Sequence, residues 1–271
     1  MTQINHKTIL ITGGASGIGK LMGEACLNKG ATSLIVWDIN QQALDDFVQH
    51  NYQFESMIHP LKVDVSDGTQ IQHAAQHILE SFGPVDILIN NAGIVVGKPF
   101  HEHSNTEVSN TLNINVQGVL ETTRCFLPTM IQRNEGHIVN IASAISLMAN
   151  PNMSVYAASK WAVFGWSESL RLELKDMNSS VRVTAVMPSY IDTGMFDGAK
   201  APLFTTMLKP NQIVDAIIYG IEQNKIYVRK PFMVKLVPFV KGILPRPLFD
   251  WVASRILGVY NSMDHFKGRN E

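Results

Sequence analysis

The chain has 271 residues, of which 45% are hydrophobic and 17% charged, with 22 Lys and Arg residues against 23 Asp and Glu residues. This composition supports a full hydrophobic core and excludes a disordered chain. A net charge of -1 disfavours binding to nucleic acid, which needs a basic excess to neutralise phosphates. We therefore expect one large domain, or one domain with an appendage, and no nucleic-acid partner.

Short apolar runs alternate with longer amphipathic ones in the first 190 residues. This alternation predicts a doubly wound α/β fold, with a Rossmann-type parallel sheet between two helical layers. Beyond residue 190 we expect a loop over 192–209, a helix over 210–223 and a short last strand over 226–228. The predicted strands are 8–12, 34–37, 61–65, 85–89, 137–141 and 181–186, and the earlier helices are 17–29, 41–50, 68–82, 105–133 and 155–176.

The last part of the chain, residues 231–271, differs in composition from residues 1–230. It is apolar and rich in proline, and the stretch 225–271 has nine basic and three acidic residues, leaving a net charge of -7 on the rest. We interpret it as a small C-terminal extension. Three roles stay open: a lid over a pocket, a dimer contact, or a membrane-surface segment within residues 231–260, because apolar residues mixed with basic ones favour an anionic interface.

Targeting and redox signals are sparse. Strand-like sequence begins at residue 7 without a basic-then-apolar leader, and no run of 18 apolar residues occurs. Cys26 and Cys125 fall in predicted helices and are interpreted as small hydrophobic residues. The pair His73 and His77 has metal-ligand spacing but lacks a third ligand, so we predict no metal. The expected location is cytoplasmic, with peripheral contact to the inner membrane surface left open.

A glycine-rich turn, Thr12–Gly19, joins the first predicted strand to the first helix. Glycines allow a tight turn and a close approach of backbone N–H groups to a pyrophosphate, while the helix N-terminus favours the anion. Asp38 ends the second strand, where a carboxylate accepts hydrogen bonds from ribose hydroxyls and repels a 2′-phosphate. Ser16, Ile39 and Asn40 offer no cation for that phosphate. NAD is therefore predicted in preference to NADP.

Tyr156 and Lys160 are four residues apart in a predicted helix and therefore share one face. A phenol with a pKa of about 10 is a poor acid or base at neutral pH, but a neighbouring ammonium group would stabilise the phenolate. We therefore expect Lys160 and a bound nicotinamide to lower the pKa of Tyr156 toward the working range. Ser143, at the end of the fifth strand, is expected to hold the substrate oxygen.

These pieces together resemble the short-chain dehydrogenase/reductase family over about residues 7–230. The resemblance rests on the glycine turn, Asn90–Gly93, Asn115, Ser143, and Tyr156 with Lys160. It implies that Tyr156 is the general acid/base, that Lys160 also grips the nicotinamide ribose, and that Asn115 holds a water in a proton relay. It further implies a homodimer or homotetramer formed through helices 105–133 and 155–176.

The resemblance also extends the expected cofactor contacts to later strand ends. Thr193 matches the threonine that holds the carboxamide, although this chain has Pro188–Ser189 where the family usually has Pro-Gly. The segment 190–196 resembles the retinol and 17β-hydroxysteroid dehydrogenase branch. The predicted cofactor contacts are Gly13, Ala15, Ser16, Gly17, Ile18, Gly19, Asp38, Ile39, Asp64, Val65, Asn91, Ala92, Gly93, Tyr156, Lys160, Pro188, Ile191 and Thr193.

Residues 145–153 and 195–208 follow strand ends and should line the substrate pocket. Both are strongly apolar, with Lys200 as the only basic residue, which favours a lipophilic alcohol or carbonyl compound such as a retinoid, steroid or fatty aldehyde. The predicted pocket residues are Ile145, Met148, Met153, Met195 and Phe196, and further apolar candidates are Leu147, Leu203, Phe204 and Met207.

The predicted reaction is hydride transfer between a nicotinamide and a carbinol carbon, by an oxidoreductase that acts on CH–OH groups. Two other functions remain possible from the motifs. One is a redox-sensing scaffold that binds the dinucleotide without turnover, and the other is an epimerase or dehydratase of the same family. The complete set Asn115, Ser143, Tyr156 and Lys160 favours catalysis over the scaffold.

Overall fold

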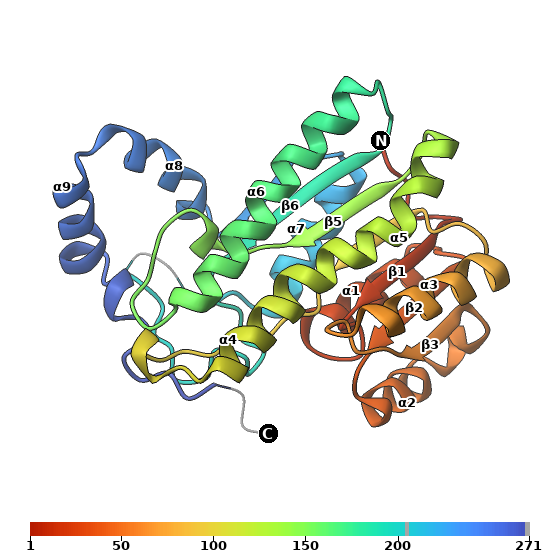
Figure 1. Ribbon diagram of the computed structural model, residues 1–271, viewed down its shortest axis with the longest axis horizontal. Coiled ribbons are helices and arrows are strands. Elements are labelled where there is room, and N and C mark those ends of the chain that lie inside the picture. The colour runs from red at the N-terminus through yellow and green to blue at the C-terminus, as the bar shows by residue number, and fades with distance from the viewer. Residues whose placement is uncertain (204–205, 269–271) are drawn as a thin grey trace.

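The computed structural model describes residues 1–203 and 206–268, and a parallel β-sheet lies at its centre (Figure 1). In the described residues the sheet has seven strands in the order β3-β2-β1-β4-β5-β6-β7. The strand order reverses direction between β1 and β4, as it does in doubly wound folds. The strands are β1 (Thr8–Thr12), β2 (Ser33–Asp38), β3 (Ile58–Lys62), β4 (Ile87–Asn90), β5 (His137–Ile141), β6 (Arg182–Pro188) and β7 (Tyr227–Lys230).

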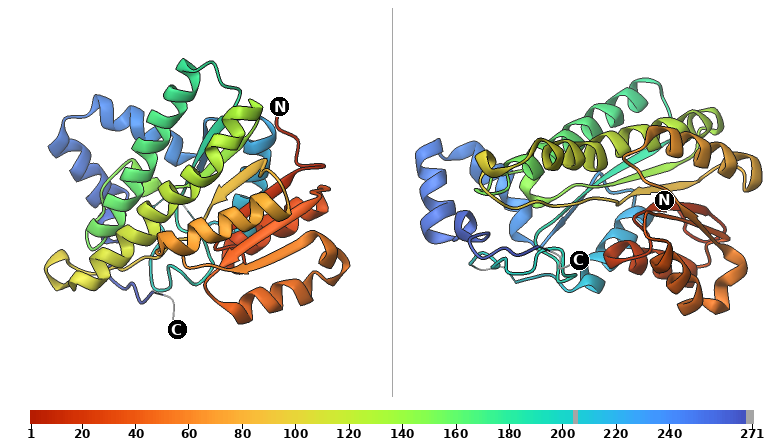
Figure 2. Two further views of the ribbon diagram at one scale, coloured as in Figure 1. Left: turned by 45° about the vertical axis from the view of Figure 1, so that its right-hand side comes forward. Right: turned by 60° about the horizontal axis from the view of Figure 1, so that its bottom comes forward.

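Helices cover both faces of this sheet, so the predicted Rossmann-type fold is confirmed (Figure 2). Successive side chains of a strand point to opposite faces: Ile9 and Ile11 of β1 pack in one core, and Leu10 packs in the other. The first core is closed by α1 (Gly17–Asn28), α2 (Gln41–His50) and α7 (Pro210–Glu222). The second is closed by α3 (Gly68–Ser81), α5 (Gly118–Arg133) and α6 (Ser154–Asp176), and α4 (Asn105–Leu112) packs against α6.

The parallel register brings the carboxyl ends of the strands to one edge of the sheet. Thr12 pairs with Trp37, and Asn90 pairs with Asn140 on the other side of the switch point. The residues that follow these strands therefore meet at a crevice, which is where ligands bind in open α/β sheets. Functional side chains from distant parts of the chain can converge there.

Most predicted elements agree with the structure to within two residues at each end, and two differ by more. The third strand was expected over 61–65, but β3 spans Ile58–Lys62, because its pairing with β2 ends at Asp38 opposite Lys62. Val63 and Val65, which suggested the later strand, are buried in the loop beyond the strand end. Their burial comes from packing at the crevice, not from strand pairing.

The helix expected over 105–133 is interrupted. A π-helical turn, Asn113–Gln117, separates α4 from α5. At the start of α5 a Cβ atom on Gly118 would lie 2.5 Å from the backbone oxygen of Val65, so glycine permits a close approach to that loop. Such π turns are frequent at functional sites, and this one contains Asn115.

The C-terminal extension consists of α8 (Met233–Ile243) and α9 (Arg246–Trp251), followed by the π turn Val252–Ile256 and the 3-10 turn Val259–Asn261. Between residues 231 and 268 the structure has helices and turns but no strand. The extension lies at the opposite end of the molecule from β2 and β3 (Figures 1 and 2). It is therefore attached outside the sheet, next to the ends of β5 and β6.

Candidate active site

The glycine-rich turn joins β1 to α1 and adopts a conformation that depends on its glycines. Gly13 and Gly17 have φ values of 61° and 54°, in the left-handed region that favours glycine. A Cβ atom on Gly19 would lie 2.1 Å from the backbone oxygen of Gly13, so Gly19 allows the helix to pack against the turn. The Asn91 amide donates to the backbone oxygens of Thr12 at 3.0 Å and Gly13 at 2.9 Å. The segment after β4 thus fixes the turn.

The N-terminus of α1 faces the crevice and carries no competing negative charge. Ser16 is the N-cap residue, its side chain makes no capping hydrogen bond, and the first turn contains no acidic residue. Ser16, Gly17 and Ile18 line the cavity in front of this helix. Unpaired N–H groups at a helix N-terminus favour an anion such as a phosphate.

Asp38 is held in a fixed orientation at the end of β2. One carboxylate oxygen accepts a hydrogen bond from the Ala15 N–H at 3.1 Å, and the other accepts from the Asn40 N–H at 3.1 Å. Asp38 and Ile39 both line the cavity, so the carboxylate is at the position where a ribose would lie. Ala15 is not among the residues of the cavity wall, and its backbone N–H orients Asp38.

The predicted cofactor residues lie around one cavity, which we call the cofactor cavity, with the exceptions of Ala15 and Gly19. Gly19 is absent from the wall because it is engaged in the contact between the turn and α1. Several residues of the wall were not predicted, and most of them are apolar side chains beside the strand ends. These are Val63, Ile94, Ile114, Ile141, Ala142 and Ser189.

Tyr156 and Lys160 occupy the same face of α6, as their spacing predicted. Both line the cofactor cavity, and the Lys160 Nζ atom lies 5.7 Å from the centre of the Tyr156 ring. The Lys160 ammonium donates a hydrogen bond to the backbone oxygen of Ile141 at 2.8 Å, which ties α6 to the end of β5. Burial lowers the pKa of Lys160 to about 8.

In the chain alone the pKa of Tyr156 is raised, whereas the lowered pKa expected from the sequence belongs to the site with a nicotinamide bound. Burial of the phenol in an apolar wall raises its pKa above 10, and the hydrogen bond with the Ser143 hydroxyl opposes this rise only in part. Tyr190 raises the pKa further. In the chain alone the desolvation of Tyr156 outweighs any help from Lys160, so the hydroxyl is a neutral proton donor.

Asn115 lies in the π turn and is completely buried. Its amide group donates to the backbone oxygen of Ile94 at 2.9 Å and to the Ser159 hydroxyl at 3.1 Å, and its Oδ1 atom accepts from the Ile94 N–H at 2.8 Å. A Cβ atom on Gly93 would lie 3.2 Å from Asn115 Oδ1 and 3.5 Å from Lys160 Nζ. Asn115 and Lys160 therefore converge on Gly93.

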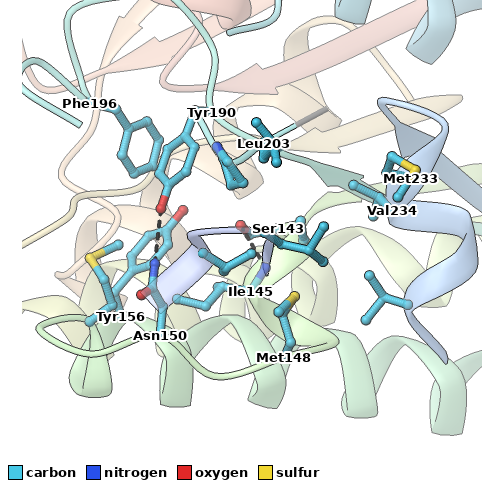
Figure 3. Close-up of a pocket in the computed structure, with 17 residues that line it drawn as sticks. Ser143, Ile145, Met148, Asn150, Tyr156, Tyr190, Phe196, Leu203, Met233 and Val234 are labelled. Atoms are coloured by element: carbon cyan, nitrogen blue, oxygen red, sulfur yellow. Dashed lines mark hydrogen bonds between the residues drawn. The ribbon is translucent and has the colours of Figure 1, made fainter. Parts of the chain in front are cut away.

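A second cavity, the apolar cavity, shares wall residues with the first. Figure 3 shows its lining side chains, and no charged residue is among the described residues that line it. Ile145, Met148, Met153 and Phe196 lie in its wall as predicted, whereas Met195 lines the cofactor cavity. The described residues of the wall are Ser143, Ala144, Ile145, Met148, Asn150, Met153, Tyr156, Ser189, Tyr190, Phe196, Pro202, Leu203, Met233, Val234, Val237, Leu257 and Val259.

The remaining apolar candidates have other positions. Leu203 lines the apolar cavity, whereas Leu147 and Met207 pack in neighbouring hydrophobic clusters. Phe204 lies outside the described residues. Five wall residues come from the C-terminal extension and were not predicted, because their sequence pattern resembles that of any apolar helix.

The apolar cavity has one polar corner. Asn150 donates to the Tyr190 hydroxyl at 3.0 Å and to the Ser262 hydroxyl at 2.9 Å, and the two hydroxyl oxygens are 2.7 Å apart. Ser262 in turn donates to the backbone oxygen of Val259. This network connects the loop after β5, the loop after β6 and the C-terminal extension, and so fixes the shape of the cavity.

The two cavities meet at Ser143, Tyr156, Ser189 and Phe196, which line both. Ser143 follows β5, and Tyr156 is in α6, so the hydroxyl groups of two different elements lie at the junction. A group that reacts here is in contact with the contents of both cavities. This geometry suits the transfer of an atom between a ligand in the cofactor cavity and one in the apolar cavity.

The residues around the cofactor cavity fit a nicotinamide dinucleotide. The glycine turn and the α1 N-terminus suit a pyrophosphate, Asp38 suits a ribose, and Lys160 lies at the opposite end beside Tyr156. Within residues 1–203 and 206–268, no group of three or more His, Cys, Asp or Glu residues is arranged to hold a metal ion. In the same residues, no helix is long and apolar enough to cross a membrane.

Comparison with known proteins agrees with this geometry. Residues 7–202 match the family model for short chain dehydrogenase. The fold and site define a nucleotide-binding oxidoreductase of the Rossmann type, and the chain belongs to the short-chain dehydrogenase/reductase family. The branch predicted from the sequence is also supported by similar proteins.

Epidermal retinol dehydrogenase 2 of Mus musculus is 34% identical over 99% of this chain and 88% of its own length. Estradiol 17-beta-dehydrogenase 11 of Rattus norvegicus is 30% identical over 98% of this chain and 89% of its own length. Among solved structures, a short-chain dehydrogenase/reductase from Burkholderia phymatum in complex with NAD has a TM-score of 0.80 and 26% identity, covering 92% of this chain and 96% of that one.

A similar structure from Burkholderia cenocepacia, in complex with NADP, has a TM-score of 0.78 and 26% identity, over 92% of this chain and 98% of that one. Neighbours of this fold thus include complexes with both nicotinamide dinucleotides. The choice between the two depends on the residues at the ribose position of each chain.

Proposed function

We propose that this protein transfers a hydride between NAD(H) and a lipophilic alcohol or carbonyl compound, of the size and polarity of a retinoid, a steroid or a fatty aldehyde. The observation that carries the proposal is the junction at Tyr156, where the cofactor cavity meets the apolar cavity, whose described wall has no charged residue. A dicarboxylate or a sugar phosphate finds no cation in the described part of that second cavity. The names of the retinol and estradiol dehydrogenases point to the same substrate class.

Each residue of the junction has a role in the proposed reaction. The nicotinamide, when bound, supplies or accepts the hydride. Tyr156 donates a proton to the carbonyl oxygen in reduction and accepts it from the hydroxyl in oxidation. Ser143 holds the same oxygen by a hydrogen bond, and Lys160 grips the ribose and adds positive charge near the phenol. Because burial raises the pKa of Tyr156, its neutral form is ready for reduction at neutral pH.

Lys160 and Asn115 provide the path by which the Tyr156 proton is replaced. The Lys160 Nζ atom and Asn115 Oδ1 converge on Gly93, next to the cofactor cavity. A water held between the Asn115 region and Lys160 would connect the ammonium group to solvent. With a pKa lowered to about 8, Lys160 gives up a proton more easily than an exposed lysine does.

NAD is the proposed cofactor because of Asp38. Its carboxylate is fixed by two backbone N–H groups and lines the cofactor cavity, where it would accept hydrogen bonds from the ribose hydroxyls. A 2′-phosphate at the same place would be repelled by this charge. Neighbouring Ile39 and Asn40 bring no cation to offset the repulsion.

A fluorescence titration with NADH and NADPH, followed by a screen of alcohols, aldehydes and ketones, tests the proposal. We expect tighter binding of NADH, and turnover of lipophilic compounds in preference to dicarboxylates and sugar phosphates. Binding of NADH without turnover of any compound would instead support a redox-sensing scaffold. Turnover of a nucleotide sugar without net oxidation of the cofactor would support an epimerase.

A further inference from the structure

Helix α8 has two apolar faces, and only one of them is covered. Met233, Val234 and Val237 form part of the wall of the apolar cavity, and Figure 3 shows Met233 and Val234 there. The opposite side carries a stripe of exposed apolar residues at helical spacing: Phe232, Leu236, Phe239 and Ile243. We call these four residues the outer stripe. Phe232 and Phe239 are 65% and 69% exposed, which is unusual for phenylalanine in a soluble domain.

The exposed surface continues beyond α8 with the same chemistry. Leu248, Trp251 and Ile256, in α9 and the π turn after it, are also exposed. Every exposed residue between 232 and 256 is apolar, glycine, proline or basic. The segment has four basic residues, and its single acidic residue, Asp250, is already bonded to Arg246 at 3.1 Å and to the Tyr260 hydroxyl at 2.6 Å.

We infer that this surface docks on an anionic lipid membrane, and that α8 is the wall through which a lipophilic substrate passes from the lipid into the apolar cavity. The second half of the inference rests on the proposed function. Apolar side chains beside basic ones, on helices too short to span a bilayer, are typical of segments that lie in the interface. Tryptophan, here Trp251, is enriched at that depth.

The positive charge of this surface favours an anionic membrane over a second copy of the chain as its binding partner. In a two-fold symmetric dimer through this surface, the same patch of both subunits would form the interface, so two surfaces with four basic residues and one acidic residue each would face one another. Arg246 is paired with Asp250, whereas Lys235 and Arg255 would add net repulsion between the two copies. An anionic headgroup layer attracts Lys235 and Arg255. The position of the extension at one end of the molecule leaves room for a flat partner (Figures 1 and 2).

The location of α8 beside the apolar cavity connects membrane docking with substrate entry. The Lys241 ammonium donates to the backbone oxygen of Leu147 at 3.0 Å and lies 4.4 Å from the centre of the Trp161 ring, so the C-terminal part of α8 is anchored to the loop after β5 and to α6. Between that anchor and β7, α8 has the apolar cavity on one side and the surface that carries the outer stripe on the other. A substrate dissolved in lipid therefore has one helix to pass, and it need not enter water.

Vesicle sedimentation tests the docking without any need for turnover. We expect the wild-type protein to sediment with vesicles of phosphatidylglycerol and phosphatidylcholine, and much less with phosphatidylcholine alone. The double variant Phe232→Ser/Phe239→Ser should lose binding by at least about tenfold, and Lys235→Gln/Arg255→Gln by about fivefold per charge. The control Tyr52→Ser removes a side chain that is 74% exposed at the other end of the molecule and should change nothing.

Trp251 reports the same event directly. Its emission should shift to shorter wavelength on addition of anionic vesicles, and the shift should disappear in Trp251→Phe. Wild-type protein that stays in the supernatant with anionic vesicles overturns the inference, as does a Phe232→Ser/Phe239→Ser variant that binds as well as Tyr52→Ser. A dimer that dissociates in this double variant, without vesicle binding by the wild type, would identify the surface as a subunit contact and also overturn it.

Substrate entry is tested with two substrates. The Phe232→Ser/Phe239→Ser variant should oxidise a long-chain alcohol embedded in anionic vesicles about tenfold more slowly than the wild type, but a short water-soluble alcohol at the same rate. Equal rates on the embedded alcohol would contradict the entry route. If neither protein oxidises any alcohol, the proposed function fails, while sedimentation still decides the docking.

Discussion

The cofactor cavity and the apolar cavity share a wall but are built in different ways. The cofactor cavity is formed by residues that directly follow the strands, such as Gly13, Asp38 and Asn91, and their backbone partners hold them. The apolar cavity is assembled from the loops after β5 and β6 and from a C-terminal extension outside the sheet. Binding of the dinucleotide therefore depends on the sheet, whereas the choice of substrate depends on segments that can vary without disturbing it.

If the two cavities meet at Tyr156, removal of the Tyr156 hydroxyl should lower turnover and leave cofactor binding unchanged. Tyr156→Phe should lower kcat by about a thousandfold, because general acid–base catalysis contributes on that order. The dissociation constant for NADH should change little. Steady-state kinetics measures kcat, and fluorescence titration measures the dissociation constant. Tyr190→Phe is the matched control, since its hydroxyl lies in the apolar cavity but bonds to Asn150 and Ser262. A similar loss of kcat in both variants would contradict the role of Tyr156 as the general acid/base.

A larger side chain on the inner face of α8 should affect the substrate but not the cofactor. Val237→Trp fills part of the apolar cavity, and we expect kcat/KM for a bulky alcohol to fall by at least about tenfold, the cost of a few lost apolar contacts. Leu236→Trp, one residue away and exposed, should be close to wild type. Weaker NADH binding in Val237→Trp would show that the two cavities are not independent.

In the cofactor cavity, Asp38→Asn should change the preference between NADH and NADPH but not the preference for a substrate. Loss of the carboxylate removes its repulsion of a 2′-phosphate, so the ratio of the NADPH and NADH dissociation constants should shift by about tenfold toward NADPH. Asp64→Asn, whose carboxylate also lines the cavity but bonds to Ser66, is the control. An unchanged ratio in Asp38→Asn would place the specificity elsewhere.

The sheet beneath both cavities should lose stability at acid pH and unfold cooperatively. His137 in β5 is buried between the hydroxyls of Thr2 and Thr184, and burial lowers its pKa to about 4. Between pH 6.5 and 4 the unfolded chain therefore binds a proton that the folded chain excludes. The free energy of unfolding should fall with falling pH by about 1.4 kcal/mol per unit from this group.

His137→Gln, which does not titrate, should show a shallower pH dependence in urea unfolding between pH 6.5 and 4. NADH binding and turnover should disappear together in the wild type as the sheet unfolds. A slope that is identical in the two proteins would mean that His137 is not the group responsible.

The parts of the site that the sequence predicts are those encoded within a few residues. The glycine turn, Asp38 at a strand end, and the spacing of Tyr156 and Lys160 each require a local conformation, and the parallel sheet then brings them together. The same reasoning included Ala15 and Gly19 among the cofactor contacts, because proximity in sequence does not show which atoms face the cavity. Those two residues instead orient Asp38 and pack α1.

Tertiary contacts explain what the sequence does not reveal. Met233, Val234 and Val237 reach the apolar cavity because the extension folds back over the strand ends, and no local motif signals that return. Met195 points to the cofactor side of the junction, although it is next to Phe196, which lines both cavities. The pKa of Tyr156 depends on burial, which cannot be read from the four-residue spacing to Lys160.

The most direct test of the account is kcat/KM with NADH for linear aldehydes of increasing length. If the carbonyl meets Tyr156 while the chain occupies the apolar cavity, kcat/KM should rise by about fourfold for each added methylene until the cavity is full. An aldehyde of equal length that ends in a carboxylate should react far more slowly. A value that does not change with length, or a preference for the charged aldehyde, would contradict the account.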